Sequence, residues 1–304
     1  MKVAIIGAGA MGCLFAAKLA QAGNHVLLVE HDPETISVIR KNGVQIKDGQ
    51  TRKRVKVPIR KTPGNLEGFD LILVMVKAYS TRFVVSELRG RIGGPSAILT
   101  LQNGLGNVEA LSQAFGHHVL AGSTTEASLR LGPGEVEHTG RGSTLVGEMN
   151  GNSSRRAANV VRLLKDAGFP SFITRYARSV VWSKAVLNSA INPVSALTRQ
   201  RNGPLGRAKA LKGLMLAILE EGAKIGEAEG ATLNVTYLSR LLSKVLRSTG
   251  QNMSSMLQDV VNGRKTEVRE LNGMISSLGQ KNGIATPIND LLLSLILGLE
   301  DSYA

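Results

Sequence analysis

Short apolar runs alternate with helical patterns along the first 174 residues. The first run ends in a glycine-rich turn, after which apolar residues at helical spacing continue to Gln21. Asp32 and Pro33 are residue types that begin a second helix. This alternation is typical of a parallel sheet with helical crossovers. The expected strands are residues 3–6, 25–30, 71–76, 97–101, 119–125, 144–147 and 172–174, with a helix near 157–167 before the last.

Helical periodicity dominates from about Arg175 onward. Glycine, asparagine and proline residues interrupt the pattern, as expected where helices end. The predicted helices cover residues 178–198, 205–229, 233–248, 251–261, 267–281 and 287–299. This change of character predicts two domains, an α/β domain over 1–174 and an all-helical domain over 175–304.

Length and composition fit a soluble globular protein, because 304 residues that are 43% hydrophobic can bury a substantial core. The longest apolar run, 291–299, is far shorter than the roughly 20 residues of a membrane span. A strand that starts directly after Met1 leaves no room for a signal peptide. The single cysteine, Cys13, excludes an intrachain disulfide framework and favours a cytoplasmic setting. Its place in a predicted helix indicates a packed thiol.

The net charge of +14 raises the question of a nucleic-acid partner. The basic residues are spread over both halves of the chain, without a basic tail, and aromatic residues that could stack on bases are few. We therefore expect neither a nucleic-acid nor a membrane partner, and no metal site. A positive field would instead help to gather an anionic cofactor and an anionic substrate.

The glycine-rich turn has the spacing G-x-G-x-x-G between a predicted strand and a predicted helix. In a dinucleotide-binding turn the first glycine allows the tight turn, the second admits the pyrophosphate and the third allows close helix packing. The helix N-terminus then presents N–H groups to the phosphates. The sequence thus predicts a Rossmann-type dinucleotide-binding domain, whose turn consists of Gly7, Ala8, Gly9, Ala10, Met11 and Gly12.

Glu30, at the end of the second expected strand, bears on the choice of dinucleotide. An acid there accepts hydrogen bonds from the adenosine ribose and repels a 2′-phosphate, which favours NAD(H). His31 is adjacent, however, and residues 52–54 supply three basic side chains that would suit a phosphate. An ordinary surface acid is the alternative for Glu30, and the preference between NADH and NADPH stays open.

Lys184, Asn188 and Asn192 repeat every four residues through an otherwise apolar stretch, which places them on one helical face. Burying an ammonium group and two amides without partners costs roughly 1–3 kcal/mol each. A small anionic carbonyl compound would supply those partners. A solvated face or an internal polar network is the alternative.

Reduction of a carbonyl requires a hydride and a proton. All five histidines lie in the first half, so Lys184 is the obvious acid if the helical half supplies the proton. Desolvation would lower the pKa of its ammonium group from about 10.4 toward the operating range. Glu267 is the carboxylate expected to orient it, and a favourable charge in the first turn of a helix is the alternative that the sequence leaves open. Lys77 and Asn103 follow two buried strands, where open α/β sheets bind ligands.

Together these residues resemble the ketopantoate reductase (2-dehydropantoate 2-reductase) family over nearly the whole chain. The motifs that carry the resemblance are Gly7-Ala-Gly-Ala-Met-Gly12, Val76-Lys-Ala-Tyr79, Gln102-Asn-Gly-Leu-Gly106, Lys184 with Asn188 and Ile191-Asn-Pro193, Asn202-Gly203, and Ser254-Ser-Met-Leu-Gln-Asp259 with Thr266-Glu267. The resemblance implies NAD(P)H-dependent reduction of 2-dehydropantoate to (R)-pantoate, on the route to pantothenate and coenzyme A.

The resemblance also implies roles for individual residues. Lys184 matches the proton donor, and Lys77, Asn103 and Glu267 match positions near the nicotinamide and the reacting centre. Ser128 matches a cofactor contact. The positions that match substrate contacts are Asn188, Asn192, Asn202 and Ser255, and we add Asn103 to them. One departure stands out, because NADPH-dependent members typically place an arginine where this chain has Glu30-His31.

Two other functions remain open at this point. The same architecture serves enzymes acting on other small 2-oxo or 3-hydroxy acids. A non-catalytic dinucleotide sensor or nucleic-acid binder is the second alternative, favoured only by the basic composition. The expected partner is a small 2-oxo acid, and a homodimer is compatible with the sequence without being required by it.

Overall fold

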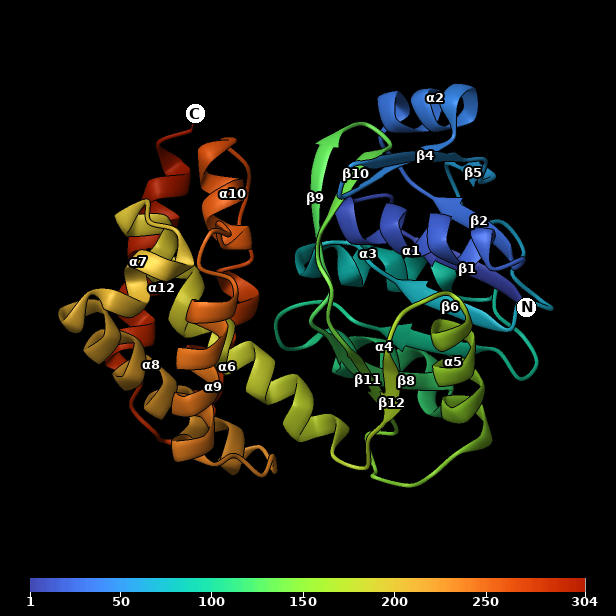
Figure 1. Cartoon of the computed structure of the whole chain (residues 1–304). Helices are drawn as coiled ribbons and strands as arrows, with labels where there is room; N and C mark the ends of the chain where they lie inside the picture. The colour runs from blue at the N-terminus through green and yellow to red at the C-terminus, as the bar shows by residue number, and fades with distance from the viewer. Residues whose placement is uncertain (304) are drawn as a thin grey trace. The chain divides into compact units, whose positions relative to one another are not determined.

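The computed structural model describes residues 1–303, and these form two compact units (Figure 1). The first unit combines Met1–Gln102 with Asn107–Ala177. The second combines the short segment Asn103–Gly106 with the chain from Arg178 onward. Asn103 therefore belongs to the helical unit, although in sequence it follows a strand of the first.

An eight-stranded sheet forms the centre of the first unit, in the order β12-β11-β8-β7-β6-β1-β2-β5. All neighbouring strands are parallel except β11 and β8. Strand β6 pairs with β1 while β2 lies on the other side of β1, so the strand order reverses at β1, as in doubly wound folds. The strands are β1 (Lys2–Ile6), β2 (His25–Val29), β5 (Ile59–Arg60), β6 (Leu71–Val74), β7 (Ala97–Thr100), β8 (Val119–Thr124), β11 (Thr144–Gly147) and β12 (Ser171–Ile173).

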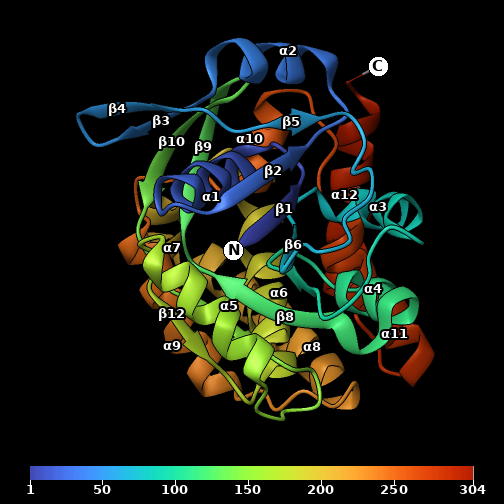
Figure 2. The same ribbon diagram turned by 90° about the vertical axis from the view of Figure 1, so that its right-hand side faces the viewer.

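Helices cover both faces of this sheet, with α1 and α5 on one side and α3 and α4 on the other (Figure 2). Phe15 of α1 stacks on Phe169 with ring centroids 4.1 Å apart. This contact joins the first crossover helix to the end of the unit. The strand order and the helices on both faces of the sheet (Figure 2) confirm the Rossmann-type prediction. The helices are α1 (Ala10–Gln21), α2 (Pro33–Asn42), α3 (Thr81–Leu88), α4 (Asn107–Phe115) and α5 (Arg155–Asp166), and a 3-10 turn, η1 (Ala78–Ser80), precedes α3.

A second, four-stranded sheet in this unit was not expected from the sequence. Its order is β4-β3-β10-β9, and its strands are β3 (Val44–Asp48), β4 (Thr51–Val55), β9 (Ala127–Gly132) and β10 (Glu135–Gly140). Strand β4 reads Thr-Arg-Lys-Arg-Val and is largely exposed, so it has no apolar alternation to reveal it. Strands β3, β9 and β10 are partly buried because they pack on α1, and their own sequences did not predict this burial.

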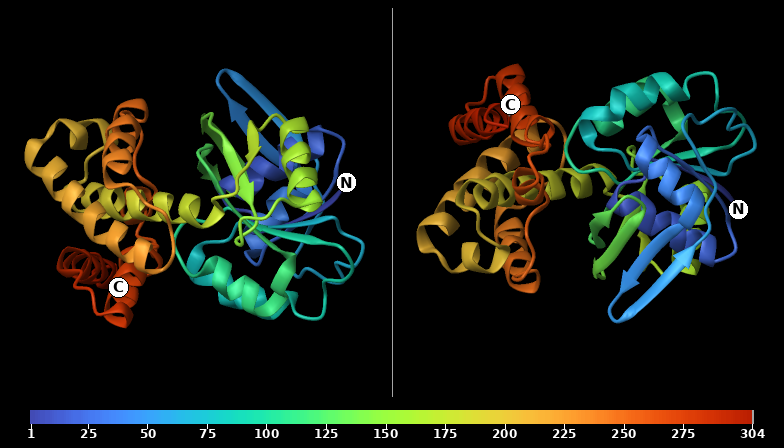
Figure 3. Two further views of the ribbon diagram at one scale, coloured as in Figure 1. Left: turned by 90° about the horizontal axis from the view of Figure 1, so that it is seen from below. Right: turned by 90° about the horizontal axis from the view of Figure 1, so that it is seen from above.

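The second unit is helical, as predicted, and Figure 3 shows α6 running through its group of helices. Its core is built from α6 and its neighbours and includes Trp182, Val186 and Ile218. The helices are α6 (Ala177–Thr198), α7 (Asn202–Arg207), α8 (Lys209–Ala228), α9 (Val235–Ser248), α10 (Ser255–Val261), α11 (Met274–Asn282) and α12 (Pro287–Asp301). Within residues 1–303, no helix combines the length and apolar character needed to cross a bilayer.

Three helix boundaries in this unit differ from the predictions. The helix expected over 205–229 is two helices, because Ala208 takes an extended conformation (φ −75°, ψ 107°) between α7 and α8. The helix expected from 251 begins only at Ser255, where the Ser254 side chain accepts a hydrogen bond from the Leu257 N–H. The helix expected over 267–281 opens with a π-helical turn, η3 (Arg269–Gly273), so Glu267 precedes the helix.

Candidate active site

The glycine turn between β1 and α1 has the backbone geometry that a dinucleotide requires. Gly7 has φ +104°, a conformation that other residues rarely adopt. A Cβ at Gly12 would lie 1.9 Å from the Gly7 carbonyl oxygen, so only glycine allows α1 to begin this close to β1. A Cβ at Gly9 would meet no atom within 4 Å, and Gly9 begins α1 without a side-chain cap. The turn therefore leaves open space beside uncapped helix N–H groups, which fits a pyrophosphate.

Glu30 follows β2 directly and is bonded to this turn. Its Oε2 accepts a hydrogen bond of 2.8 Å from the Ala8 N–H, and its Oε1 accepts from the N–H groups of His31 (2.7 Å) and Asp32 (3.2 Å). Three backbone donors thus fix the carboxylate beside the turn. Glu30 is partly buried, and its carboxylate retains acceptor capacity beyond these three hydrogen bonds.

Lys77 and Ser128 are the other predicted cofactor contacts in the first unit. Lys77 follows β6 and caps η1, so it lies at the carboxyl end of the sheet as expected. Ser128 lies on β9 opposite His138 of β10. Within residues 1–303 the buried Ser128 Oγ has no hydrogen-bond partner. A hydroxyl without a protein partner is available to a ligand.

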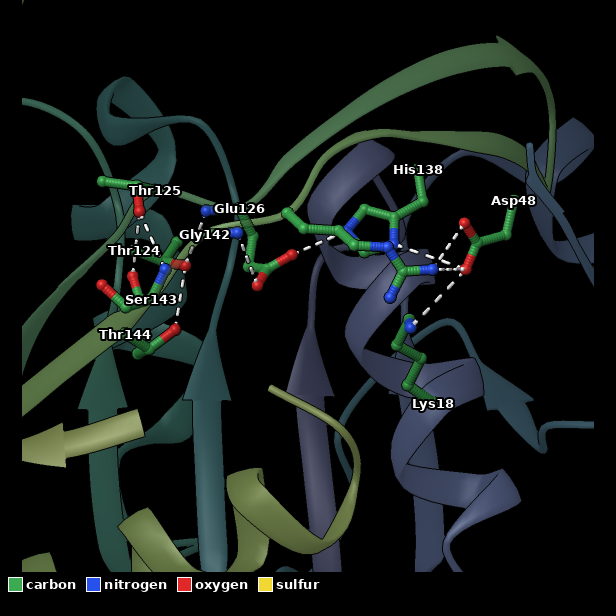
Figure 4. Close-up of polar contacts among 10 residues, drawn as sticks. Lys18, Asp48, Thr124, Thr125, Glu126, His138, Gly142, Ser143 and Thr144 are labelled. Carbon is green, nitrogen blue, oxygen red and sulfur yellow. Dashed lines mark hydrogen bonds and ion pairs between the residues drawn. The ribbon is translucent and has the colours of Figure 1, made fainter. Parts of the chain in front are cut away.

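A buried polar network holds the β9–β10 hairpin against α1 (Figure 4). His138 Nε2 lies 2.6 Å from Glu126 Oε2, and both side chains are buried. On its other side, the His138 Nδ1 lies 3.7 Å from Asp48, which also pairs with Lys18 of α1 and with Arg141. Because charged groups from α1, β3 and the hairpin meet in one place, this network fixes where β9 presents its side chains.

In the helical unit, Lys184 is a partly buried lysine of α6. Desolvation lowers the pKa of its ammonium group to about 8, and the negative charge of Glu267 opposes that shift. Glu267 is buried, with 6% of its surface exposed. The two residues predicted to act together thus influence each other electrostatically, from α6 and from the segment before η3.

Two further predicted residues meet in this unit. The Asn192 Nδ2 donates to Ser255 Oγ at 3.3 Å, which joins α6 to the first residue of α10. Asn188, one turn before Asn192, is partly buried. Lys184, Asn188 and Asn192 therefore form one stripe along α6, flanked by the fully buried Ala185 and Val186.

Asn202 is buried at the start of α7, and its Nδ2 donates to Thr249 Oγ1 at 2.8 Å. Its Oδ1 is buried and, within the described part of the chain, has no partner. The chain does leave the helical conformation between α6 and α7, but at residues 199–201, and Asn202, Gly203 and Pro204 form the first turn of α7.

The segment Asn103–Gly106 is built into the helical unit beside η3. The Leu105 N–H donates to the Glu270 carbonyl at 2.8 Å, and a Cβ at Gly104 (φ +82°) would lie only 2.7 Å from the same oxygen. Asn103 is thus carried next to the Glu267–Glu270 region of its own unit.

Glu270 is a site residue that the sequence interpretation missed. Burial raises the pKa of its carboxyl, and the neighbouring Glu267 raises it further. Its Oε2 is buried without a hydrogen-bond partner among residues 1–303. The available signal was its position three residues after Glu267, a spacing that would bring the two carboxylates together in the helix expected over 267–281.

The first unit thus offers phosphate-binding N–H groups and a fixed acid for a ribose, and the second offers a desolvated cation, amides and a hydroxyl. Such groups can hold a dinucleotide and protonate an oxygen of a small anionic substrate. These features define the class of two-domain, dinucleotide-dependent oxidoreductases.

The chain belongs to the ketopantoate reductase PanE/ApbA family. The family model of that description matches residues 3–151, and the model of the family's C-terminal domain matches residues 177–300. The 2-dehydropantoate 2-reductase of Pyrococcus abyssi is 33% identical over 99% of this chain and 98% of its own length. That of Archaeoglobus fulgidus is 36% identical, with 98% of each chain covered.

Solved structures show the same fold over the whole chain. A ketopantoate reductase of this family from Ralstonia eutropha aligns with a TM-score of 0.91 and 31% identity, covering 100% of this chain and 99% of that one. D-Mandelate dehydrogenase in complex with NADH and anilino(oxo)acetate aligns with a TM-score of 0.94 and 28% identity, at the same coverage. Members of this fold thus include a protein whose structure contains NADH.

Proposed function

We propose that the protein catalyses the NAD(P)H-dependent reduction of 2-dehydropantoate to (R)-pantoate, in pantothenate and coenzyme A biosynthesis. The observation that carries this proposal is the desolvated Lys184 beside Glu267, in a chain whose relatives are 2-dehydropantoate 2-reductases over their full length. We also propose a cytoplasmic location, because the single cysteine, Cys13, is a free thiol, as is usual in a reducing compartment.

The cofactor would be held by the first unit. The turn Gly7–Gly12 and the uncapped N-terminus of α1 bind the pyrophosphate, and Glu30 accepts hydrogen bonds from the adenosine ribose. Lys77, Ser128, Asn103 and Glu267 are the further proposed contacts. When bound, the reduced nicotinamide supplies the hydride.

Lys184 is the proposed proton donor to the substrate's 2-oxo oxygen. An ammonium group with a pKa of about 8 is protonated at neutral pH and yet is a much stronger acid than a free lysine. Its charge also stabilises negative charge that develops on that oxygen. Glu267 keeps the group protonated, because its carboxylate opposes the effect of desolvation.

Polar groups around this lysine would orient the substrate. Asn192 and Ser255 are already in contact, and both retain hydrogen-bonding capacity for a carboxylate or a hydroxyl. Asn188 lies one turn from each of its neighbours on the stripe, and Asn202 contributes an unpaired Oδ1. With Asn103 they form the proposed set of substrate contacts.

A second candidate is the reduction of another 2-oxo acid with NADH. Two observations favour it, namely the TM-score of 0.94 to a D-mandelate dehydrogenase that holds NADH, and the acid Glu30 where NADPH-dependent members typically carry arginine. The two candidates share Lys184 and differ in what fills the substrate site.

Rates with two substrates and two cofactors distinguish the candidates. Purified protein would be assayed by the loss of NADH or NADPH absorbance with 2-dehydropantoate and, separately, with the 2-oxo acid that corresponds to mandelate. We expect a higher kcat/KM for 2-dehydropantoate. A higher value for the aromatic acid would establish the second candidate, and no oxidation with either acid would contradict both.

A further inference from the structure

Arg130 connects strand β9 to the first turn of α2, where nothing in the sequence pointed to a site. Its Nη2 donates to Thr35 Oγ1 at 3.0 Å, and Thr35 in turn is bonded to Asp32, the residue that caps α2. The residue is exposed, and its Nε makes only a long bond of 3.4 Å to the Gly132 carbonyl. Among residues 1–303, its other N–H groups have no hydrogen-bond partner.

Hydrogen bonds connect Arg130 to the acid that follows β2, because Arg130 donates to Thr35, Thr35 donates to Asp32 and the Asp32 N–H donates to Glu30. Hydrogen bonds from Thr35 lower the pKa of the Asp32 carboxyl, and the positive charge of Arg130 contributes to the same shift. Burial raises the pKa of the Cys13 thiol to about 12, Arg130 counteracts this shift and Glu30 adds to it. Arg130 and Glu30 therefore both act on the first turns of α1 and α2.

We propose that Arg130 binds the 2′-phosphate of NADPH, so that the chain accepts NADPH in addition to NADH despite the acid at Glu30. This inference rests on the dinucleotide site proposed above. The 2′-position of the adenosine ribose lies at the acid that ends the second strand of a Rossmann-type unit. A guanidinium group reaching the residues just after that acid is suited to bind a phosphate through two parallel hydrogen bonds.

The position of Arg130 compensates for the arginine that NADPH-dependent members typically carry directly after β2, where this chain has Glu30 and His31. Glu30 and Asp32 alone would present two negative charges to a 2′-phosphate and repel it. One arginine directed at the same turn offsets part of that repulsion. The alternative basic residues, Arg52–Arg54, lie on the exposed strand β4, where Arg52 is paired with Glu135 at 3.2 Å.

A purely structural role is the competing explanation, in which Arg130 only fastens β9 to α2. If Arg130 had only this structural role, its loss would weaken the binding of every adenosine ligand to a similar degree and would also lower the stability of the unit. Loss of a 2′-phosphate contact would weaken only those ligands that carry that phosphate. A pair of ligands that differ in this one group separates the two roles.

Adenosine 2′,5′-bisphosphate and 5′-AMP form such a pair, and calorimetry on the full chain would measure the Kd of each. In Arg130→Gln we expect the Kd of the bisphosphate to rise at least about tenfold, as for loss of a charge-assisted hydrogen bond. The Kd of 5′-AMP should stay within about twofold. Equal losses for both ligands, or no loss for either, would overturn the proposal, as would failure of the wild-type chain to bind the bisphosphate.

Matched variants control for charge and folding. Arg52→Gln removes an arginine of the same small sheet and should leave both Kd values unchanged. Arg130→Lys keeps the charge without the planar fork, so its Kd for the bisphosphate should lie between those of the wild type and Arg130→Gln. Because it changes the chain less, it also tests the proposal if Arg130→Gln does not fold, which thermal unfolding would reveal.

The outcome is independent of the reaction assay. If the wild-type chain binds the bisphosphate through Arg130 but oxidises neither NADH nor NADPH with any 2-oxo acid, the proposed function fails and the cofactor inference stands. If 2-dehydropantoate is reduced with NADH alone, and Arg130→Gln binds both ligands like the wild type, the function stands and the inference fails.

Discussion

The two units of this protein differ in which atoms form their candidate ligand-binding sites, main-chain atoms in one and side chains in the other. In the first unit the turn proposed to bind the pyrophosphate is made of backbone, because Gly9 leaves open space and Gly12 has no room for a Cβ. In the helical unit the site is made of side chains, and Lys184, Asn192 and Ser255 provide its chemistry. The turn of the first unit thus depends on the absence of Cβ atoms, whereas the site of the helical unit depends on the presence of particular side-chain groups.

This contrast predicts different responses to mutation. Adding one methyl group to the glycine turn should damage binding without removing any functional group. Removing one functional group from the α6 stripe should damage catalysis without changing how the cofactor binds.

The largest effect is expected from Lys184→Ala. Loss of a general acid costs about 10²–10⁴-fold in rate, so kcat should fall by at least about 10²-fold. The Kd of NADH or NADPH, measured by fluorescence titration, should change little, because the glycine turn is intact. Lys209→Ala, at the exposed start of α8, is the control and should keep wild-type kcat. Near-normal turnover in Lys184→Ala would remove the lysine from the mechanism.

Two glycine substitutions test the role of the backbone turn in the first unit. In Gly12→Ala the new Cβ meets the Gly7 oxygen at 1.9 Å, so overpacking should lower the free energy of unfolding by about 1–3 kcal/mol and weaken cofactor binding as well. In Gly9→Ala the Cβ meets no protein atom, so only cofactor binding should weaken. Thermal unfolding and cofactor titration measure the two effects. Equal stability of both variants would contradict this account.

The pH dependence of reduction should report the lysine directly. A donor with a pKa of about 8 loses its proton as the pH rises through that value, so kcat/KM should fall about tenfold per pH unit above it. Oxidation of the hydroxy acid needs the neutral amine and should rise over the same range. In Glu267→Gln the opposing charge is gone, so both inflections should move to lower pH. Unchanged pH profiles in Glu267→Gln would show that Glu267 does not influence the pKa of Lys184.

The smallest effect is expected from the contact between α6 and α10. Asn192→Ala removes the hydrogen bond to Ser255 and one proposed substrate contact, which corresponds to about 0.5–1.5 kcal/mol, or roughly a two- to twelvefold rise in KM. Ser255→Ala and the double variant complete a double-mutant cycle. Strict additivity in KM would show that the two side chains act separately on the substrate.

Much of the site was predictable because its signals are local. Glycine spacing in the turn and four-residue spacing along α6 both follow from the geometry of a single element, and the structure shows both arrangements. Glu30 was identifiable as well, since it directly follows β2.

Arg130 escaped prediction, and Ser128 was named only through the family resemblance. Both residues lie on β9, whose sheet exists because β10 pairs with β3, about 90 positions earlier in the chain. Nothing in the sequence identified the buried His138–Glu126 pair, whose members are 12 residues apart in the chain. Asn103 directly follows the loop after β7, and only tertiary contacts with η3 assign it to the helical unit.

The segment Asn103–Gly106 has a consequence for dissecting this protein. Because these four residues belong to the helical unit while the chain before and after them belongs to the first, the polypeptide changes units at three places. A protease cut after Ala177 would therefore leave this tetrapeptide on the α/β fragment, while the residues it packs against lie on the helical fragment. A gene truncated at the same point would produce an α/β fragment whose tetrapeptide has lost the hydrogen bond from Leu105 to the Glu270 carbonyl.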